Sequence, residues 1–212
     1  MTFLKIIVPM LISGLKVTFT IAIAGIFFGL IVGSFCGYLL QTEHKLAKTI
    51  AETYIWVIRA TPIMVQALYV YFVIPKLLGV DWGATIIGII VIALNSGAFI
   101  SEIVKGALLG IDPGQKEAAA CLGYTRFQTM VYVIVPQALK IALPAMFNQF
   151  IISVKDTALL SIITVNEMTH QVQNYVAMSF KVIPGYTALA ICYLLVISLL
   201  IIVQKRIEKR LR

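Results

Sequence analysis

Long runs of apolar residues, separated by short polar segments, follow one another along most of the chain. Three of these runs contain no charged side chain: residues 17–42, 82–101 and 182–204. A helix needs about 20 mostly apolar residues to cross a bilayer, and a charge at the bilayer centre costs roughly 2.5–3.5 kcal/mol. Each of the three runs is therefore predicted to form a membrane-spanning helix.

Two further apolar stretches carry charged residues in their interior. The stretch 54–75 contains Arg59, and the stretch 141–166 contains the adjacent residues Lys155 and Asp156. Both are otherwise strongly apolar, so we count them as spans as well. The sequence thus predicts an all-α, polytopic membrane protein with a single domain over residues 1–212 and spans at about 12–41, 53–75, 83–108, 138–165 and 184–204. The moderately polar loop 166–185 leaves room for an interfacial helix.

The composition excludes several other classes of protein. Hydrophobic residues make up 60% of the chain and charged residues 12%, against about 45–50% and about 25% in an ordinary soluble domain. The three cysteines are scattered and lack the spacing of metal ligands, so neither a disulfide scaffold nor a metal site is expected. The net charge of +8 is carried mostly at the ends of the apolar runs, so we expect membrane lipid and no nucleic acid as a partner.

The distribution of Lys and Arg predicts the orientation in the membrane. If the C-terminus lies inside, the inner segments hold eleven basic residues: Lys45, Lys48, Lys105, Lys116, Arg126, Lys140 and five in the tail 205–212. The outer segments hold four: Lys5, Lys16, Lys76 and Lys181. Because basic residues favour the cytoplasmic side, we expect the N-terminus outside and the C-terminus in the cytoplasm. The odd number of spans argues against two internal inverted repeats, so the chain is expected to form half of a pore.

The polar segment 110–136 has the pattern of a short helix, a glycine turn and a second short helix. Asp112-Pro113 is typical of a helix start, and Gly123 of a left-handed helix end. Thr125 and Gln128 then form a capping box for the second helix, which Pro136 is expected to terminate. The alanines at 118–120 let another surface approach closely, and Glu117 and Arg126 place opposite charges beside the turn. Such an element suits docking into a groove on a cytosolic partner. An ordinary capped loop helix explains these residues equally well.

Several short motifs are similar to those of one transporter family. Glu117-Ala118-Ala119, Gly123 and Ile134-Val135-Pro136 together resemble the EAA signature of the membrane subunits of ATP-binding-cassette importers, with valine where leucine is common. Three further stretches resemble the polar-amino-acid branch of these subunits: Arg59-Ala60-Thr61-Pro62 with Gln66, residues 95–99 with Glu102, and residues 155–159. The resemblance extends from about Ile12 to Arg206.

The resemblance implies a type I importer permease subunit with five helices, located in the bacterial cytoplasmic membrane. It would act as a dimer with a second copy or with a homologous permease subunit. Its cytoplasmic helix pair would fit a cleft in a cytosolic ATPase subunit, and an extracytoplasmic binding protein would deliver a polar amino acid. The residues implied in coupling to the ATPase are Glu117, Ala118, Ala119, Gly123 and Arg126.

The sequence contains no nucleotide-binding motif. A phosphate-binding loop requires glycine, four residues, and then Gly-Lys-Ser or Gly-Lys-Thr. The nearest stretch, 110–116, has the wrong spacing and contains Pro113. ATP and Mg²⁺ are therefore expected on a partner subunit, and neither a cofactor nor a catalytic residue is expected in this chain. A passive channel or a structural membrane subunit is the alternative function; a hydrolase is disfavoured, because no Ser-His or paired-carboxylate arrangement stands out.

Polar residues inside the spans are candidates for contact with a substrate, since such residues are costly in lipid and usually face a cavity or each other. The candidates are Arg59, Thr61, Asn95, Glu102, Lys155, Asp156 and Asn166. At about 1.5 Å per residue, Arg59 and Glu102 both lie at a depth of roughly 10 Å on the inner half, level with each other. Asn95 and Glu102 are seven residues apart and share a helix face. Lys155 and Asp156 point about 100° apart, so at least one needs a partner elsewhere.

Glu102 and the nearby break residue Pro62 each have a structural interpretation as well as a functional one. Glu102 either is neutralised by Lys105 or Arg59 and stabilises the bundle, or holds the ammonium group or basic side chain of a substrate. Pro62 either kinks its helix or opens the backbone near Arg59 and exposes groups that bind a carboxylate.

The charges of the candidates favour one class of amino acid. Three acids, Glu102, Asp156 and Glu167, are set against two bases, Arg59 and Lys155. This excess favours a basic amino acid such as arginine, lysine or histidine. Glutamine, glutamate and cystine are the alternatives, because each would fit a polar pocket.

Overall fold

The computed structural model describes residues 2–211, so Met1 and the basic Arg212 of the tail lie outside the described residues. Among residues 2–211 there is no strand, and the all-α class is confirmed. In chain order the elements are α1 (Thr2–Leu39), α2 (Lys45–Ala60), α3 (Ile63–Phe72), α4 (Ile74–Leu78), α5 (Ala84–Leu109), α6 (Gly114–Cys121), α7 (Arg126–Gln128), the π-helix η1 (Thr129–Ile134), α8 (Val135–Asp156), the 3₁₀-helix η2 (Thr157–Ile163), α9 (Met168–Ser179) and α10 (Val182–Leu211).

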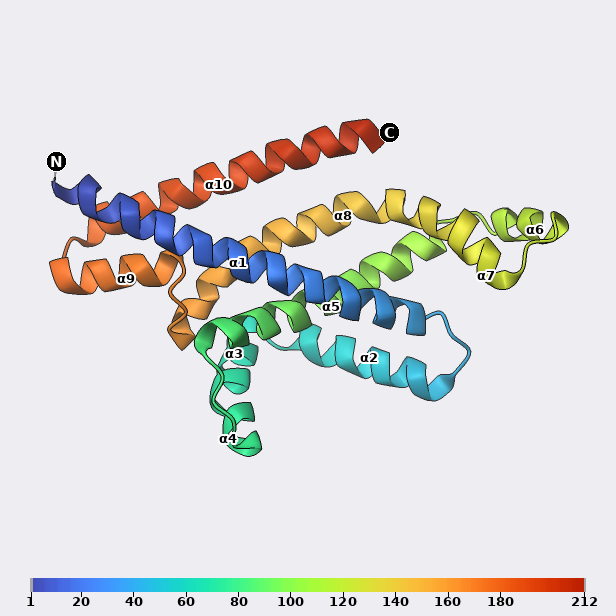
Figure 1. Cartoon of the computed structure of the whole chain (residues 1–212), viewed down its shortest axis with the longest axis horizontal. Helices are drawn as coiled ribbons and strands as arrows, with labels where there is room; N and C mark the ends of the chain where they lie inside the picture. The colour runs from blue at the N-terminus through green and yellow to red at the C-terminus, as the bar shows by residue number, and fades with distance from the viewer. Residues whose placement is uncertain (1, 212) are drawn as a thin grey trace.

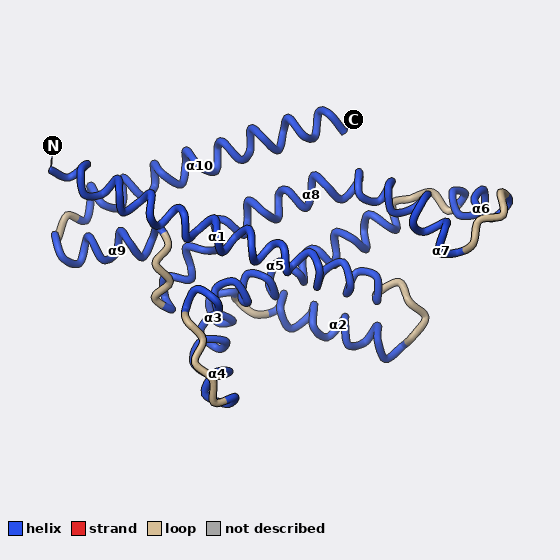
Figure 2. Tube along the Cα trace, in the orientation of Figure 1, coloured by secondary structure: helices blue, strands red, loops and turns tan. Residues whose placement is uncertain are grey.

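Four long helices, α1, α5, α8 and α10, run roughly along the long axis of the molecule (Figure 1). The N-terminus and α9 lie at one end of this axis, and α6 and α7 lie at the other (Figure 1). α4 projects to one side, beyond α3, and short loops connect the helices (Figure 2). The segment 110–136, which we call the coupling segment, is therefore far from the N-terminus.

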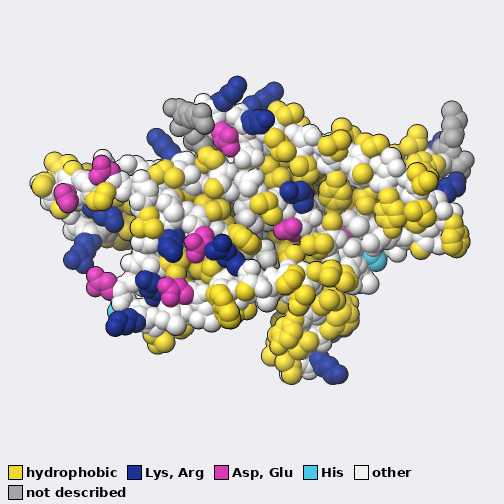
Figure 3. Space-filling model, turned by 180° about the vertical axis from the view of Figure 1, so that it is seen from behind, with side chains coloured by type: hydrophobic (Ala, Val, Ile, Leu, Met, Phe, Trp, Pro, Cys, Tyr) yellow, Lys and Arg dark blue, Asp and Glu magenta, His cyan; other side chains and the backbone are white. Residues whose placement is uncertain are grey.

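Hydrophobic side chains cover much of the outside of the molecule. Leu194, Leu195 and Leu199 of α10, for example, are 66%, 65% and 63% exposed. Charged side chains gather mainly over the half that contains α2, α6 and α7, whereas the projecting arm of α3 and α4 is almost wholly hydrophobic (Figure 3). Surfaces of this kind require lipid or other subunits around them.

The expected number of five spans is reached when the broken second span is counted as one. Among residues 2–211, four helices are long and apolar enough to cross a membrane: Phe3–Leu39, Ala84–Leu109, Arg126–Ile163 and Val182–Arg210. The pair Lys45–Ala60 and Ile63–Leu78 is long and apolar enough when its two parts are taken together.

The second span is not one helix over residues 53–75, as the apolar pattern predicted. α2 begins earlier, at Lys45, and makes an angle of 106° with the pair α3–α4. Thr61 is extended, with φ −116° and ψ 140°, because a residue before proline avoids the helical conformation. Pro62 also has no N–H to continue the hydrogen-bond ladder. It therefore breaks the span and does not merely kink it.

The helix that starts after Thr125 does not end before Pro136, contrary to the prediction. It continues through α7, η1, α8 and η2 as far as Ile163. The π-helical turns explain why Pro136 is tolerated: the N–H of Val135 bonds to the carbonyl of Met130, five residues earlier, and the wider turn relieves the clash that a proline ring makes in an α-helix. The fourth span is thus one helical rod with the second half of the coupling segment.

A stripe of glycines joins α1 to α5. Four glycines occur at four-residue spacing on α1 and lie against residues of the same spacing on α5: Gly25, Gly29, Gly33 and Gly37 against Ile92, Ser96, Ile100 and Val104. A Cβ atom at any of the four would come closer than 3.0 Å to α5. Small residues allow membrane helices to approach at this range and to pack by van der Waals contact. This stripe was not among the features predicted from the sequence.

The helix expected in the last loop is α9, and it packs against both ends of the chain. Ile7 and Leu11 of α1 form a buried cluster with three residues of α9 and one of α10: Met168, Val172, Tyr175 and Leu189. Gly14 makes the contact with α9 possible, since a Cβ atom there would lie 2.6 Å from the Cα atom of Met168.

Candidate functional site

A groove of about 430 Å³ lies between α2 and α5 and contains two of the predicted site residues. It is lined by Leu40, Glu52, Ile55, Trp56, Arg59, Ala60, Glu102 and Lys105. Nη1 of Arg59 lies 3.9 Å from Oε1 of Glu102, and the two side chains are 48% and 38% exposed. The guanidinium carbon of Arg59 also lies 5.7 Å from the ring centre of Phe99. The structure therefore brings Arg59 and Glu102 together, at the same level of the bundle.

The charges that line this groove are balanced. Glu52 and Glu102 supply two acids, and Arg59 and Lys105 supply two bases. The sequence had selected Arg59 and Glu102 but not Glu52, because Glu52 lies at the polar start of the span, where a charge needs no explanation. A groove with separate, balanced charges can bind a zwitterion so that both the positive and the negative group of the ligand face an opposite charge.

Thr61 lies at the break between α2 and α3, and Asn95 lies on α5 within hydrogen-bond distance of Gln66 of α3; neither is among the residues that line the groove. The hydroxyl of Thr61 donates to the carbonyl of Val57 at 2.8 Å. Asn95 is 8% exposed, and its Nδ2 donates to Oε1 of Gln66 at 3.2 Å. Gln66 thus joins the candidate residues; its only signal in the sequence was its place in the motif that begins at Arg59.

Lys155, Asp156 and Asn166 are not part of the α2–α5 groove. Lys155 lines a different groove of about 500 Å³ between the end of α8 and α10, together with Tyr193 and Ser198. Asp156 is the last residue of α8 and is partly buried, and Asn166 is exposed in the loop before α9. Within one chain the seven candidates are therefore divided among separate places.

Glu167, counted above among the acids, is fully buried and has a structural role. Its carboxylate accepts hydrogen bonds from the backbone N–H groups of Thr169 at 2.8 Å and His170 at 2.7 Å, which caps the start of α9. The hydroxyl of Tyr193 on α10 donates to the same carboxylate at 3.2 Å. With Glu167 engaged in this way, the remaining candidates are two acids and two bases, and the excess of acid disappears.

The coupling segment has the turn that the sequence predicted. The N–H of Tyr124 bonds to the carbonyl of Ala119, and that of Gly123 to the carbonyl of Ala120, at 3.1 and 3.0 Å. With Gly123 at φ +82°, this is a Schellman motif. The capping box of Thr125 and Gln128 is also present, with bonds of 2.9 and 3.2 Å.

The first helix of the coupling segment is α6, and it begins one residue later than expected. α6 starts at Gly114, whose N–H bonds to Oδ1 of Asp112 at 2.8 Å, and Pro113 precedes it in a helical conformation. Nε2 of Gln137 on α8 donates to Oε1 of Gln115 on α6 at 3.1 Å, which fastens α6 to the fourth span.

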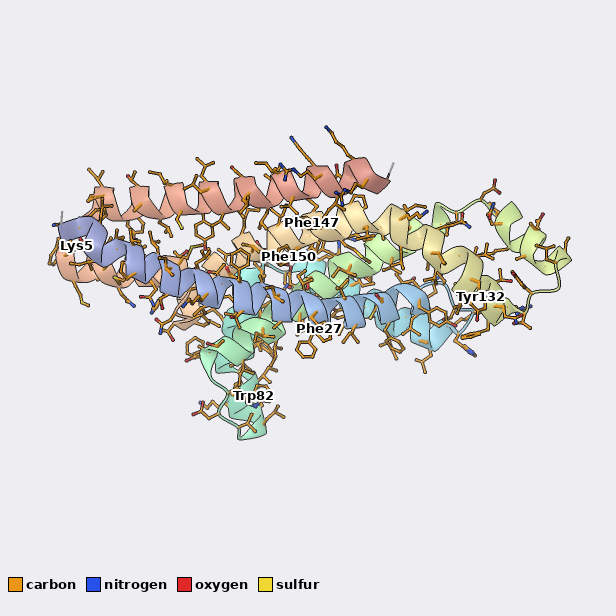
Figure 4. The ribbon with its side chains drawn as sticks, turned by 45° about the horizontal axis from the view of Figure 1, so that its top comes forward. Lys5, Phe27, Trp82, Tyr132, Phe147 and Phe150 are labelled. Atoms are coloured by element: carbon orange, nitrogen blue, oxygen red, sulfur yellow. The ribbon has the colours of Figure 1, made fainter. Side chains whose placement is uncertain are left out.

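Most of the predicted coupling residues are exposed at the far end of the molecule. Ala119 is 3% exposed and packs inward, whereas Glu117, Ala118, Gly123 and Arg126 are exposed. Three apolar residues of the same region were not predicted: Leu122, Phe127 and Tyr132 are 77%, 76% and 68% exposed. Figure 4 places Tyr132 at this end and Lys5 at the opposite end. Large apolar side chains in an otherwise polar turn were the available signal.

Comparison with known families decides which of the sequence interpretations applies. The family described as "Binding-protein-dependent transport system inner membrane component" matches residues 29–212. The chain belongs to this family. The resemblance to permease subunits of ATP-binding-cassette importers is thereby confirmed, and the protein is a membrane component of such a transporter.

Individual relatives of this permease subunit cover nearly all of its length. The "Glutamine transport system permease protein GlnP" of Escherichia coli (strain K12) is 38% identical over 208 residues, which are 97% of this chain and 94% of that protein. The "Arginine transport system permease protein ArtQ" of Bacillus subtilis (strain 168) is 29% identical over 205 residues, again 97% and 94% of the two chains.

Solved structures agree with the fold. One described as "Crystal structure of an amino acid ABC transporter with histidines" has a TM-score of 0.89 and 33% identity, and the match covers 96% of this permease and 94% of that chain. A MetNI methionine ABC transporter in an inward-facing conformation has a TM-score of 0.79, 20% identity and 96% coverage of both chains; this match bears on the fold alone.

Membership of the family also defines the kinds of partner. A permease subunit of an ATP-binding-cassette importer works with ATPase subunits, a substrate-binding protein and a second permease subunit. ATP is thus bound and hydrolysed on a separate chain.

Proposed function

We propose that this permease forms half of the translocation pathway for a polar L-amino acid, by alternating access driven by ATP hydrolysis in its partner subunits. The observation that carries the proposal is the ion pair of Arg59 and Glu102 in the α2–α5 groove. A guanidinium suits an α-carboxylate and a carboxylate suits an α-ammonium group. At 3.9 Å the two side chains are close enough to pair with each other, and each can exchange this partner for one charged end of an amino acid.

The balance of charge favours an amino acid with a neutral polar side chain, and glutamine is our first candidate. Two acids and two bases line the groove, and a zwitterion adds no net charge to it. With Glu167 engaged as a helix cap, the excess of acid that favoured a basic substrate is gone. The GlnP relative, named for glutamine transport, supports the same choice.

A basic amino acid is the second candidate. Asp156 at the end of α8 offers a further carboxylate, next to the 3₁₀-helix η2. A relative named for arginine transport and a solved amino acid transporter described with histidines support this alternative.

The decisive experiment is an uptake assay with the complete complex in proteoliposomes. The complex of this chain, its ATPase subunits and its binding protein would be supplied with labelled glutamine, arginine, histidine, lysine, glutamate or cystine, with and without ATP. We expect ATP-dependent uptake of glutamine. Preferential uptake of arginine, lysine or histidine would support the second candidate, and uptake that persists without ATP would contradict the importer and favour a passive channel.

We also propose that the N-terminus faces outward and that the coupling segment faces the cytoplasm. The excess of Lys and Arg on one side supports this orientation. Cys121 in the coupling segment is exposed and provides a natural probe. In a variant with Cys36→Ser and Cys192→Ser, an impermeant thiol reagent should label Cys121 in inside-out vesicles and leave it unlabelled in right-side-out vesicles; the reverse pattern would contradict the topology.

A further inference from the structure

The break in the second span leaves a backbone carbonyl without its usual donor. In a continuous helix, the N–H at position 62 would bond to the carbonyl of Ile58, but Pro62 has no N–H. Within a membrane such a carbonyl must find another partner, because no bulk water is present and an unmet group is costly. The hydroxyl of Thr61 lies 3.5 Å from this carbonyl oxygen, at the limit of a hydrogen bond, so the break still needs a closer donor.

The side chain of Gln66 supplies this donor. Gln66 lies in the first turn of α3, beyond the break, and its Nε2 lies 2.8 Å from the carbonyl oxygen of Ile58. The same amide group also lies 3.0 Å from the carbonyl and 3.0 Å from the hydroxyl of Thr61. Gln66 thus reaches back across Pro62 and closes the end of α2.

The other end of the same amide is held by α5. Nδ2 of Asn95 donates to Oε1 of Gln66 at 3.2 Å, and Asn95 is almost fully buried. Tyr54, midway along α2, donates to the carbonyl of Leu94, the neighbour of Asn95, at 2.6 Å. One side-chain amide therefore connects three elements: the end of α2, the start of α3 and the middle of α5.

The position of Arg59 depends on this connection. Arg59 directly follows Ile58, and its guanidinium reaches Phe99 and Glu102, which lie one and two helical turns beyond Asn95 on α5. Hydrogen bonds hold this part of α2 against α5 on both sides of Arg59: that of Tyr54 before it and those of Gln66 after it. Loss of the hydrogen bonds of Gln66 would leave the last turn of α2 free to rotate or fray.

We propose that Gln66 and Asn95 form a clasp that positions Arg59 against Glu102 by holding the end of α2 at the break. This inference rests on the proposed function, because it assigns the Arg59–Glu102 pair to substrate binding. Gln66 and Asn95 are positioning residues and do not touch the substrate. A primary amide is required at position 66, since it must donate to Ile58 and accept from Asn95 at once; a carboxylate offers no donor and leucine offers neither.

The test uses the complete complex in proteoliposomes, with labelled glutamine as the probe. Gln66→Leu, Gln66→Glu and Asn95→Leu should each raise the KM for glutamine uptake about fivefold, the equivalent of one hydrogen bond, with a smaller change in kcat. Gln171→Leu, which changes the same side chain on α9, a helix that contributes none of the hydrogen bonds of the clasp, is the matched control and should leave KM unchanged. A KM within twofold of wild type in all three clasp variants overturns the proposal.

Two double variants test whether Gln66 positions Arg59 or only provides a hydrogen bond to the carbonyl of Ile58. Pro62→Ala restores a backbone N–H at position 62, the usual donor to that carbonyl. If Gln66 positions Arg59, Pro62→Ala will not restore KM in the Gln66→Leu background; restoration of KM by Pro62→Ala means that Gln66 only satisfies the carbonyl, and overturns the clasp.

The second double variant, Gln66→Leu with Glu102→Gln, tests whether the clasp acts through the ion pair. We expect a KM close to that of Glu102→Gln alone, because the positioned partner is already lost; additive effects on KM contradict the clasp. If Glu102→Gln alone has no effect on uptake, the proposed site itself fails. If Glu102→Gln impairs uptake and the clasp variants do not, only the clasp fails.

Discussion

Gly33 of α1 and Gly97 of α5 are in direct backbone contact: a Cβ atom on Gly33 would lie 2.6 Å from the carbonyl oxygen of Gly97. The same Cβ would also lie 2.7 Å from Cβ of Ile100. A side chain at position 33 therefore cannot be accommodated unless α1 moves away from α5. Because the glycine stripe continues along α1, such a movement would disturb the contact over several turns.

We expect Gly33→Val to destabilise the permease by about 1–3 kcal/mol, the usual range for overpacking. Thermal unfolding in detergent, followed by size-exclusion chromatography, measures this effect. The matched control is Gly106→Ala on α5, where nothing lies within 4 Å of an added Cβ atom. Alanine favours a helix interior over glycine by roughly 0.5–1 kcal/mol, so Gly106→Ala should be neutral or stabilising. Equal stability of Gly33→Val and wild type would show that the helices are not held at this distance.

The Arg59–Glu102 pair should matter for uptake more than for folding. Both side chains are partly exposed, so loss of the ion pair should change stability by no more than about 1 kcal/mol. A hydrogen bond from a charged group to substrate is stronger, and Arg59→Gln or Glu102→Gln should reduce kcat/KM for uptake about 10-fold to 100-fold. The measurement is uptake kinetics at matched amounts of assembled complex.

The double variant Arg59→Gln with Glu102→Gln distinguishes the two interpretations of this pair. If the residues bind substrate, the double variant remains as poor in uptake as the single variants. If they only neutralise each other in the bundle, removal of both charges restores uptake. Restored uptake would thus remove Arg59 and Glu102 from the proposed site.

The buried carboxylate of Glu167 should contribute to stability and not to selectivity. It caps α9 and accepts from Tyr193, so Glu167→Ala should cost about 1–2 kcal/mol through loss of the cap. Tyr193→Phe should cost about 1 kcal/mol, and the double variant should cost less than the sum, because the two residues share one bond. Thermal unfolding of the single and double variants in detergent measures these losses of stability. A changed preference between glutamine and arginine in the Glu167 variant would contradict a purely structural role.

Local sequence signals predicted the parts of this fold that depend on neighbouring residues. The spans follow from the apolar runs, and the turn at Gly123 and the cap at Thr125 follow from conformational and hydrogen-bonding preferences that act over a few residues. The pairing of Arg59 with Glu102 was also predictable, because both lie at the same depth in helices of regular rise.

Features that depend on two segments at once were not predictable in the same way. Gln66 and Asn95, whose amides bond to each other beside the break at Pro62, are 29 residues apart in the chain. The tolerance of Pro136 depends on π-helical turns that no residue type specifies. The glycine stripe has a recognisable spacing, but its meaning depends on α5 having residues of matching spacing opposite it.

The exposed apolar side chains of the coupling segment should be needed for binding of the ATPase. Phe127 is 76% exposed at the end of the molecule that contains α6 and α7 (Figure 1), and Phe127→Ala should reduce the amount of ATPase subunit that copurifies, as should Glu117→Lys and Gly123→Arg. Buried aromatic anchors at interfaces typically contribute 2 kcal/mol or more, which corresponds to about a 30-fold weaker affinity on truncation.

Phe180→Ala is the matched control, since Phe180 is 86% exposed after α9 at the opposite end. Normal copurification and normal substrate-stimulated ATP hydrolysis in all three coupling variants would contradict a docking role for the segment, whereas a loss in Phe180→Ala as well would point to a general defect in assembly.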